Sequence, residues 1–232
     1  SRHACTATIY AADPRSDLAL LRLDLKELGL RADELRAIPW PAQGKVRKGQ
    51  FVISLANPYW IARDGSASAM WGIVSNISRR PAVLQPDGQR PSTLPDLGHL
   101  IQVDHRLPVG CSGAPVLNLR GELIALSSSI AAIEGHERSG GFAVPLDSDN
   151  RWIVDDLLRG YEVEYGFLGI QPRRAEVSSY FGLDEVTRQP GVVEVLSMSA
   201  GTPAAFAGLR LNDLILSIND QPTLSEIDLM RV

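Results

Sequence analysis

Short apolar runs with β-strand character recur at regular spacing through the first two thirds of the chain, and this recurrence constrains the fold more than any other feature. Turn-forming pairs, among them Asn57-Pro58 and Asp64-Gly65, lie between or just after the runs. Many short strands joined by turns are typical of a barrel or a sandwich, so we predict a mainly β fold. The predicted strands are 18–23, 51–55, 70–75, 101–103, 115–117, 123–127 and 141–144.

The run 18–23 is almost continuously apolar, which predicts a strand that is buried on both faces. Residues 79–98 carry four prolines and predict a long exposed loop. After residue 146 the pattern changes to an amphipathic helix that is capped by one of residues 147–149 and ends at Gly160. The apolar stripe of this helix consists of Ile153, Val154, Leu157 and Leu158.

A new alternation of strands and turns follows this helix, which indicates a second domain. We therefore predict a first domain at 1–146, a linker helix within 147–165 and a second domain at 166–232. No internal repeat or low-complexity segment interrupts this order.

Composition excludes several classes of function. The 232 residues carry a net charge of −4 and give a pI near 5.6, so the chain offers no basic surface for nucleic acid. Hydrophobic residues make up 44% of the chain, enough for a globular protein with a real core. No run has the length of a membrane helix, and no signal peptide heads the chain. The start at Ser1 reads as the interior of a longer protein, so any targeting segment is expected to lie outside it.

The chain has two cysteines, Cys5 and Cys111. One disulfide between them is possible in an oxidising compartment, but two free thiols are the simpler expectation. No spacing of cysteine and histidine resembles a zinc site, so we expect no metal and no cofactor.

The stretch Gly110-Cys111-Ser112-Gly113 predicts a serine nucleophile in a turn that glycines support. A serine hydroxyl becomes nucleophilic when a base accepts its proton and donors stabilise the oxyanion that forms. The backbone N–H groups of Gly110 and Ser112 could converge on one oxygen, and Gly113 would let a substrate approach closely. Taken alone, the stretch also fits an ordinary Gly-Ser turn of a β protein.

A second string, 13–21, lies well upstream and contains Asp17 directly before an apolar run. By itself Asp17 fits an aspartate that solvates the end of a strand. Together with Ser112 it suggests two members of a Ser-His-Asp hydrolytic triad.

Several strings of this chain occur in the order seen in HtrA-type (DegP-like) serine proteases. They are DPRSDLALLRL, VRKGQFVISLANP, WGIVSNI, IQVDHRLPVGCSGAPVLNLRGELIALSSSI and GGFAVP. The resemblance covers nearly the whole chain. It implies a chymotrypsin-like double β-barrel, of which the first barrel is incomplete in this chain, followed by a PDZ domain.

The resemblance also implies roles for individual residues. Asp17 would orient the catalytic histidine, Ser112 would be the nucleophile, and Gly110 with Ser112 would supply the oxyanion hole. A strand containing Ser127, Ser128 and Ser129 would line the primary specificity pocket and pair with the substrate backbone.

The second domain resembles a PDZ domain that is truncated at its C-terminal end. Its carboxylate-binding loop would contain Phe167, Leu168, Gly169 and Ile170, whose N–H groups would receive a peptide C-terminus. Standing alone, this loop also fits a plain strand with flanking glycines. Asn212-Asp213 departs from the usual Gly-Asp of the family.

None of the four histidines fits the catalytic position. His3 lies too close to Asp17 in sequence, and His105 is interpreted as a loop or surface residue. His99 and His136 lie in polar loops. We therefore expect the catalytic histidine upstream of Ser1, and we expect this chain alone to be inactive.

Cys111 occupies the position where trypsin-like zymogen enzymes have an aspartate that pairs with a new N-terminus. A thiol cannot form that ion pair, so activation by that route is not expected. Cysteine proteases of the same fold place their nucleophile directly before the glycine, where this chain has Ser112.

The resemblance implies an ATP-independent serine endopeptidase of protein quality control that degrades misfolded or unfolded proteins through an acyl-enzyme. The alternative is an inactive, chaperone-like pseudoprotease that only binds proteins. Implied partners are C-terminal peptides at the PDZ domain and either further copies of the chain, as a trimer, or a complementing N-terminal fragment. The family occurs in the periplasm and the cell envelope.

Overall fold

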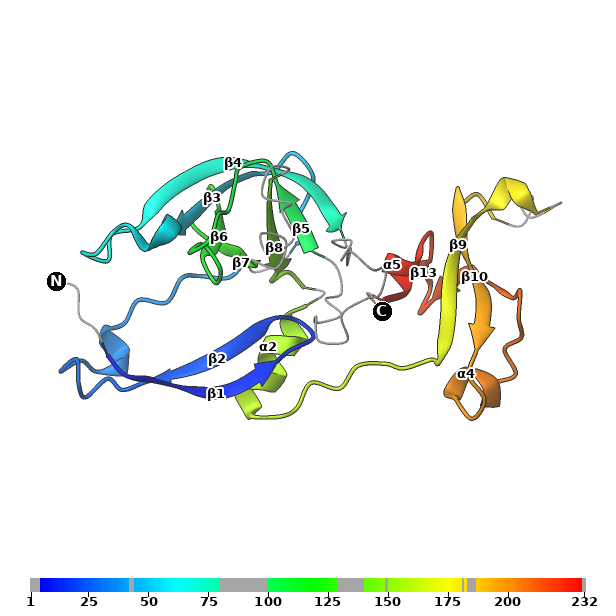
Figure 1. The fold of residues 1–232 in the computed structure, drawn as a ribbon, viewed down its shortest axis with the longest axis horizontal. Helices are drawn as coiled ribbons and strands as arrows, with labels where there is room; N and C mark the ends of the chain where they lie inside the picture. The colour runs from blue at the N-terminus through cyan, green and yellow to red at the C-terminus, as the bar shows by residue number, and fades with distance from the viewer. Residues whose placement is uncertain are drawn as a thin grey trace. The chain divides into compact units, whose positions relative to one another are not determined.

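The structure is a computed structural model that describes residues 5–41, 44–79, 100–128, 140–148, 150–180, 182 and 187–230 (Figure 1). It divides into two compact units, Ser1–Val163 and Glu164–Val232. The domain boundaries predicted from the sequence, at 1–146, 147–165 and 166–232, stay predictions. The predicted loop at 79–98 lies outside the described residues except for Arg79.

The first unit contains a closed barrel with the strand order β3-β4-β5-β8-β7-β6, in which each neighbouring pair is antiparallel (Figure 1). The mainly β fold that the sequence predicts is therefore confirmed, and the strand-like runs from 51 onward all lie in this barrel. The strands are β3 (Phe51–Ala56), β4 (Ser68–Arg79), β5 (Leu100–Val103), β6 (Pro115–Asn118), β7 (Leu123–Ser128) and β8 (Gly141–Pro145).

The interior of the barrel is built by alternation along the strands. On β3, Val52, Ser54 and Ala56 are buried, while the residues between them are more exposed. Val74 of β4 and Val116 of β6 are fully buried in the same core cluster. Burying a valine side chain contributes about 1.5–3 kcal/mol, so these positions hold the scaffold on which the loops are mounted.

Strands β1 (Ala7–Asp13) and β2 (Leu18–Leu23) form a separate antiparallel hairpin. The prediction that 18–23 is buried on both faces is wrong, because Leu21 is 58% exposed and Leu23 45% exposed. Within the described residues β2 pairs with β1 alone and not with the barrel, so much of its surface stays uncovered. Strand β1 was not predicted from the sequence.

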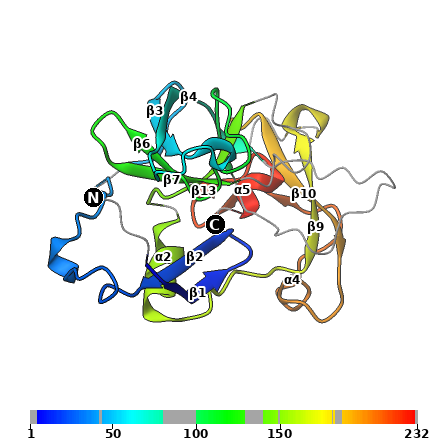
Figure 2. The same cartoon turned by 60° about the vertical axis from the view of Figure 1, so that its left-hand side comes forward.

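Helix α2 (Arg151–Arg159) contacts both strands of this hairpin, and both views show it beside β1 and β2 (Figures 1 and 2). Its cap is Asn150 rather than a residue of 147–149, and the Asn150 side chain makes no capping hydrogen bond. It ends at Gly160, which has φ +74°, as predicted. Ile153 and Leu157 are buried, whereas Leu158 is 59% exposed, so the buried stripe is narrower than predicted.

The second unit contains a three-stranded antiparallel sheet with the order β11-β10-β9 and a short hairpin of β12 and β13. The strands are β9 (Ile170–Glu176), β10 (Gly191–Met198), β11 (Leu214–Ile215), β12 (Ser217–Ile218) and β13 (Gln221–Pro222). Two short helices accompany them, α4 (Pro203–Phe206) and α5 (Glu226–Met230).

Short 3₁₀ segments complete the described structure: η1 (Ala32–Glu34), η2 (Pro58–Trp60) and η4 (Val177–Ser179). None of the helices in the described part of the chain is both long and apolar enough to cross a membrane.

Candidate active site

Ser112 is exposed in the turn that precedes β6, and the glycines on both sides of it need their conformational freedom. Gly110 has φ +92° and Gly113 has φ +76°, values that side chains rarely adopt. Gly110 also packs against the chain that follows β3, since a Cβ there would lie 2.7 Å from the carbonyl oxygen of Asn57. A Cβ added to Gly113 would meet no protein atom within 4 Å, so the turn itself needs glycine there only for its backbone conformation.

Along this turn, backbone N–H groups that donate a hydrogen bond alternate with groups that donate none within the described residues. Cys111 N–H donates to Pro108 O at 3.0 Å, Gly113 N–H to Ser127 O at 2.8 Å and Ala114 N–H to Cys111 O at 3.1 Å. Among the described residues, the N–H groups of Gly110 and Ser112 find no hydrogen-bond acceptor. These two groups are the ones that the sequence analysis assigned to an oxyanion hole. They are free to bind an oxygen of a ligand.

Ser127 supports the turn from β7. Its hydroxyl donates to Cys111 O and accepts from Ala114 N–H at 3.0 Å, and its own N–H donates to Ala114 O at 2.9 Å. The side chain is only 4% exposed. Ser127 therefore holds the backbone around Ser112 in place, a role that its position in the sequence did not reveal.

Asp17 lies in the turn between β1 and β2, in the left-handed region at φ +57°. Its Oδ2 accepts a hydrogen bond of 2.7 Å from the Ser128 hydroxyl. The carboxylate of Asp13 shapes the same turn, because it accepts from Ser16 N–H at 3.0 Å. Asp17 and the turn of Ser112 are thus both held by β7, through Ser128 and Ser127. Ser129 lies outside the described residues.

His105 is not the surface residue that the sequence analysis expected, because its side chain is only 10% exposed. Its Nε2 forms a 2.8 Å hydrogen bond with the hydroxyl of Ser54, a buried residue of the barrel interior. Its Nδ1 has no hydrogen-bond partner in the described structure and lies 3.8 Å from Asp104 Oδ1. Burial lowers the pKa of His105, although the carboxylate of Asp104 opposes this shift.

Gly72 on β4 admits this arrangement, since a Cβ there would lie 2.0 Å from Asp104 Oδ1 and 2.8 Å from His105 Nδ1. The Nε2 of His105 is therefore hydrogen-bonded to Ser54 inside the barrel, and we do not assign His105 as the base for Ser112. His3, His99 and His136 lie outside the described residues.

Cys5 and Cys111 are both free, as the sequence analysis expected. Cys111 is only 1% exposed and belongs to the core cluster of the barrel. Burial raises the pKa of its thiol, which disfavours the thiolate that nucleophilic attack requires. The turn thus buries Cys111 and exposes Ser112.

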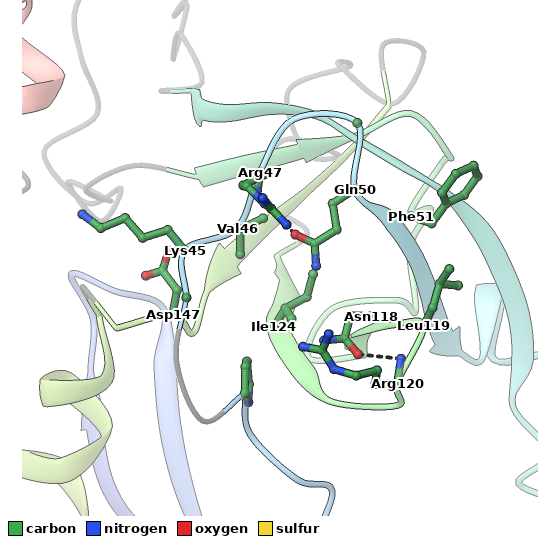
Figure 3. Close-up of a pocket in the computed structure, with 13 residues that line it drawn as sticks. Lys45, Val46, Arg47, Gln50, Phe51, Asn118, Leu119, Arg120, Ile124 and Asp147 are labelled. Atoms are coloured by element: carbon green, nitrogen blue, oxygen red, sulfur yellow. Dashed lines mark hydrogen bonds between the residues drawn. The ribbon is translucent and has the colours of Figure 1, made fainter.

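A pocket of about 530 Å³ lies at the other end of β6 (Figure 3). Ser112 precedes β6, whereas Asn118, Leu119 and Arg120 of the pocket lie at the end of the strand and just after it. Lys45 and Arg47 line it from the segment before β3. Its lining contains no histidine, no serine and no predicted site residue, so it lies apart from the candidate chemistry.

In the second unit, the loop before β9 presents backbone donors in the predicted place. The N–H groups of Phe167, Leu168 and Gly169 donate no hydrogen bond within the described residues. Two carbonyl groups of the loop are anchored, since Ala204 N–H donates to Leu168 O and Ser199 N–H to Gly169 O, each at 3.0 Å. Gly169 has φ +79°, and a Cβ there would lie 2.3 Å from the Cβ of Thr202. Ile170 begins β9, one of the two edge strands of the described sheet.

Asn212 explains the departure from Gly-Asp in this unit. It has φ +67°, and asparagine tolerates the left-handed region better than most residues with a side chain. The Asp213 carboxylate accepts from Arg210 N–H at 2.8 Å and closes the turn. The substitution therefore preserves the turn.

Comparison with known proteins agrees with this architecture. A family model of the trypsin-like peptidase domain matches residues 1–126, and one of the PDZ domain matches residues 194–232. The chain belongs to the trypsin-like peptidase family and is an HtrA/DegP-like member of it with a PDZ domain.

The chain is 31% identical over 225 residues to the periplasmic pH-dependent serine endoprotease DegQ of Escherichia coli, covering 96% of this chain and 44% of DegQ. It is 30% identical over 236 residues to a probable periplasmic serine endoprotease, DegP-like, of Pseudomonas fluorescens, covering 98% of this chain and 43% of that protein. The chain thus spans less than half the length of these curated relatives.

Two solved structures share the fold. One is the HtrA-type protease AlgW with decapeptide, with a TM-score of 0.65 and 24% identity over 97% of this chain and 62% of that one. The other is the serine endoprotease from Yersinia pestis, with a TM-score of 0.58 and 25% identity over 97% of this chain and 64% of that one.

Proposed function

We propose that the protein is an ATP-independent serine endopeptidase of HtrA type that cleaves exposed segments of misfolded or unfolded proteins. One observation carries the proposal: exposed Ser112 lies in a turn where the N–H groups of Gly110 and Ser112 have no acceptor among the described residues, while those between and after them are bonded. Both donors can bind water in the free protein and exchange it for the oxyanion of a bound substrate.

The reaction proceeds through an acyl-enzyme. Ser112 Oγ attacks the carbon of the scissile carbonyl group and passes its proton to the imidazole of a histidine that precedes Ser1. The carbonyl oxygen becomes an oxyanion and accepts hydrogen bonds from the N–H groups of Gly110 and Ser112. The C–N bond then breaks as the imidazolium protonates the departing amine, and water hydrolyses the ester by the same proton route.

Asp17 orients that histidine and stabilises its charged form. The hydrogen bond from Ser128 supports this role, because it holds Oδ2 of the carboxylate, while Oδ1 has no hydrogen-bond partner within the described residues. We further propose that the strand of Ser127, Ser128 and Ser129 binds the acyl half of the substrate through its backbone and lines the primary specificity pocket. The hydroxyl groups of Ser127 and Ser128 serve the scaffold instead.

The second unit recognises C-terminal peptides. Their carboxylate is received by the N–H groups of Phe167, Leu168 and Gly169, and the peptide adds a strand at β9, beginning beside Ile170. The free donors of the loop and the open edge of β9 in the described sheet support this assignment.

We also propose that the protein acts as a homo-oligomer, a trimer by analogy with its family, in the periplasm or cell envelope. An exposed aromatic pair supports an interface between copies. Phe51 and Trp71 stack with ring centroids 6.2 Å apart on the outer face of β3 and β4, and they are 49% and 73% exposed. Sedimentation of the full-length protein and of Trp71→Ser tests this, since the variant should shift toward smaller species.

A fluorophosphonate probe tests the proteolytic function in the full-length protein. Labelling should occur at Ser112, should vanish in Ser112→Ala and should slow strongly in Asp17→Ala. The isolated 232-residue chain should label slowly or not at all. Rapid stoichiometric labelling of the isolated chain would contradict a histidine upstream of Ser1, and failure of the full-length protein to label would contradict the proteolytic function.

A further inference from the structure

The chain segment that follows β3 forms one wall of the turn around Ser112. Tyr59 N–H donates to Val109 O at 2.7 Å. A Cβ placed on Gly110 would lie 2.9 Å from Tyr59 N and 3.3 Å from Trp60 N. Residues 59–61 therefore lie directly beside the predicted oxyanion donor at Gly110.

The side chains of residues 59–61, called here the 59–61 cluster, are apolar and exposed. Tyr59 is 58% exposed, Trp60 67% and Ile61 75%. Side chains that serve the core are buried, so these three do little for the stability of the barrel. Adjacent exposed apolar side chains at the rim of a site are typical of a surface that binds a ligand.

The backbone beneath this cluster is strained. Tyr59 has φ +55° and Trp60 has φ +53°, a region that glycine or asparagine adopts more easily than an aromatic residue. If the segment served only as a turn, a glycine would form it with less strain. Aromatic side chains at two successive strained positions therefore indicate a functional requirement for the rings.

The turn is also closed by a side chain, which fixes where the cluster lies. Asn57 Nδ2 donates to Ala62 O at 3.0 Å, and Asn57 Oδ1 accepts from Ala62 N–H at 2.9 Å. This pair of bonds spans the 59–61 cluster from end to end. Its side chains are thus presented by a backbone that is ordered before any ligand binds, which favours binding.

We infer that the 59–61 cluster is a subsite for an apolar side chain of the substrate on the leaving-group side of the scissile bond. The inference rests on the proposed proteolytic function. β7 bonds to the turn at Gly113, through Ser127 O, and the acyl half of the substrate is proposed to pair there. The cluster lies at Gly110, on the other side of Ser112 along the turn, so the departing half of the substrate passes over it.

This position predicts a selective kinetic effect. A contact with the departing half exists until the C–N bond breaks and the first product leaves. It therefore contributes to acylation, and so to kcat/KM, but not to hydrolysis of the acyl-enzyme. A substrate without an amino acid after the scissile bond cannot use the cluster.

The test uses the full-length protein and substrates with one common acyl half. One substrate is a peptide p-nitroanilide, which has no residue after the scissile bond, and two are quenched fluorescent peptides with leucine or glycine there. In Trp60→Gly, kcat/KM for the leucine peptide should fall about 10-fold or more, while that for the p-nitroanilide stays unchanged. The preference for leucine over glycine should fall by the same factor.

Two further variants provide a second test of the subsite and a control. Tyr59→Asn also suits the left-handed backbone and should show the same selective loss if Trp60→Gly fails to fold. Tyr161→Ala is the matched control, because it removes a similarly exposed aromatic side chain of the same unit, 62% exposed, that follows helix α2. It should change neither substrate preference nor fluorophosphonate labelling.

Equal losses on the p-nitroanilide and the leucine peptide would overturn the inference, because the cluster would then only support the turn. If Ser112 labels normally and the leucine preference is absent or unchanged in both variants, the subsite alone is wrong. If the unmodified full-length protein does not label, the proteolytic function and the subsite fall together.

Discussion

Two loops of this molecule present free backbone N–H groups, one around Ser112 in the first unit and one at residues 167–169 in the second. Around Ser112 the N–H groups of Gly110 and Ser112, which have no acceptor in the described part of the chain, alternate with a bonded one, and the Ser127 side chain braces the backbone. In the other loop three successive N–H groups have no acceptor among the residues that the structure describes, and backbone bonds anchor its carbonyl groups.

The difference matches the anions that the two loops are proposed to bind. An oxyanion is a single oxygen that exists briefly, so its donors must converge and must be rigid before the charge develops. A peptide carboxylate has two oxygens and a full charge throughout, so a row of donors serves it without the same precision. The following changes should separate the two loops, and they are arranged from the largest expected effect to the smallest.

Gly110→Ala should impair catalysis most. The new methyl group would lie 2.7 Å from Asn57 O, and φ +92° is unfavourable for alanine, so the donor at residue 110 must move. Loss of one oxyanion donor lowers kcat by about 10²–10³-fold. Steady-state kinetics of the full-length protein measures this, and binding of C-terminal peptides by the second unit should not change.

Gly121→Ala, in the turn between β6 and β7 and away from the predicted substrate path at Gly113, is the matched control for that change. It has a comparable positive φ but open space around it, so it should cost about 1–2 kcal/mol of stability with a much smaller loss of kcat. Equal kinetic losses in both variants would contradict the oxyanion role of Gly110.

Gly169→Ala should break the loop of the second unit in the same way. The added Cβ would lie 2.3 Å from Thr202, which forces the loop away from its position. We expect affinity for a C-terminal peptide, measured by calorimetry, to fall about 10-fold or more, with fluorophosphonate labelling intact. Gly166→Ala, where the new Cβ meets nothing within 4 Å, should bind normally; if it binds as poorly as Gly169→Ala, the clash is not the cause.

Ser128→Ala should lower kcat about 10-fold, less than the loss of an oxyanion donor. The variant removes the 2.7 Å hydrogen bond to Asp17, and a hydrogen bond to a charged group contributes about 1.5–3 kcal/mol, only part of which reaches the transition state. Peptide binding by the second unit should stay unchanged. Activity equal to that of the unmodified protein would show that Asp17 is oriented by other contacts.

His105 should give the first unit a modest sensitivity to acid. Burial depresses its pKa in the folded state, so at pH values above the ordinary histidine pKa both folded and unfolded states are neutral and stability is unaffected. As pH falls below that value, the unfolded state binds the proton more readily, and the folded state loses stability.

Thermal unfolding of His105→Gln should therefore show a smaller decrease of Tm between pH 7 and pH 5 than that of the unmodified protein. The charged and polar groups that face the ring are the carboxylate of Asp104 and the hydroxyl of Ser54. An identical pH dependence in the two proteins would contradict a buried, neutral His105.

Much of the fold could be predicted because its signals are local. The alternation on β3 and the glycine that ends α2 depend on residues close together in the chain. The exposure of Leu21 and Leu23 could not be predicted, because an apolar run looks the same whether or not other strands cover it. The aromatic residues at 59 and 60 were also missed, since nothing in their sequence indicates a contact with Gly110.

The sequence by itself determined the family, the mainly β fold and the positions of Ser112, Asp17 and the glycines of both loops. Only the tertiary structure decided which backbone donors stay free, that Ser128 holds Asp17 across 111 residues, and that His105 bonds to Ser54 across 51. The physical reason is that strand propensity and turn chemistry act between neighbours along the chain. A hydrogen bond between distant residues exists only after the barrel has closed and brought them together.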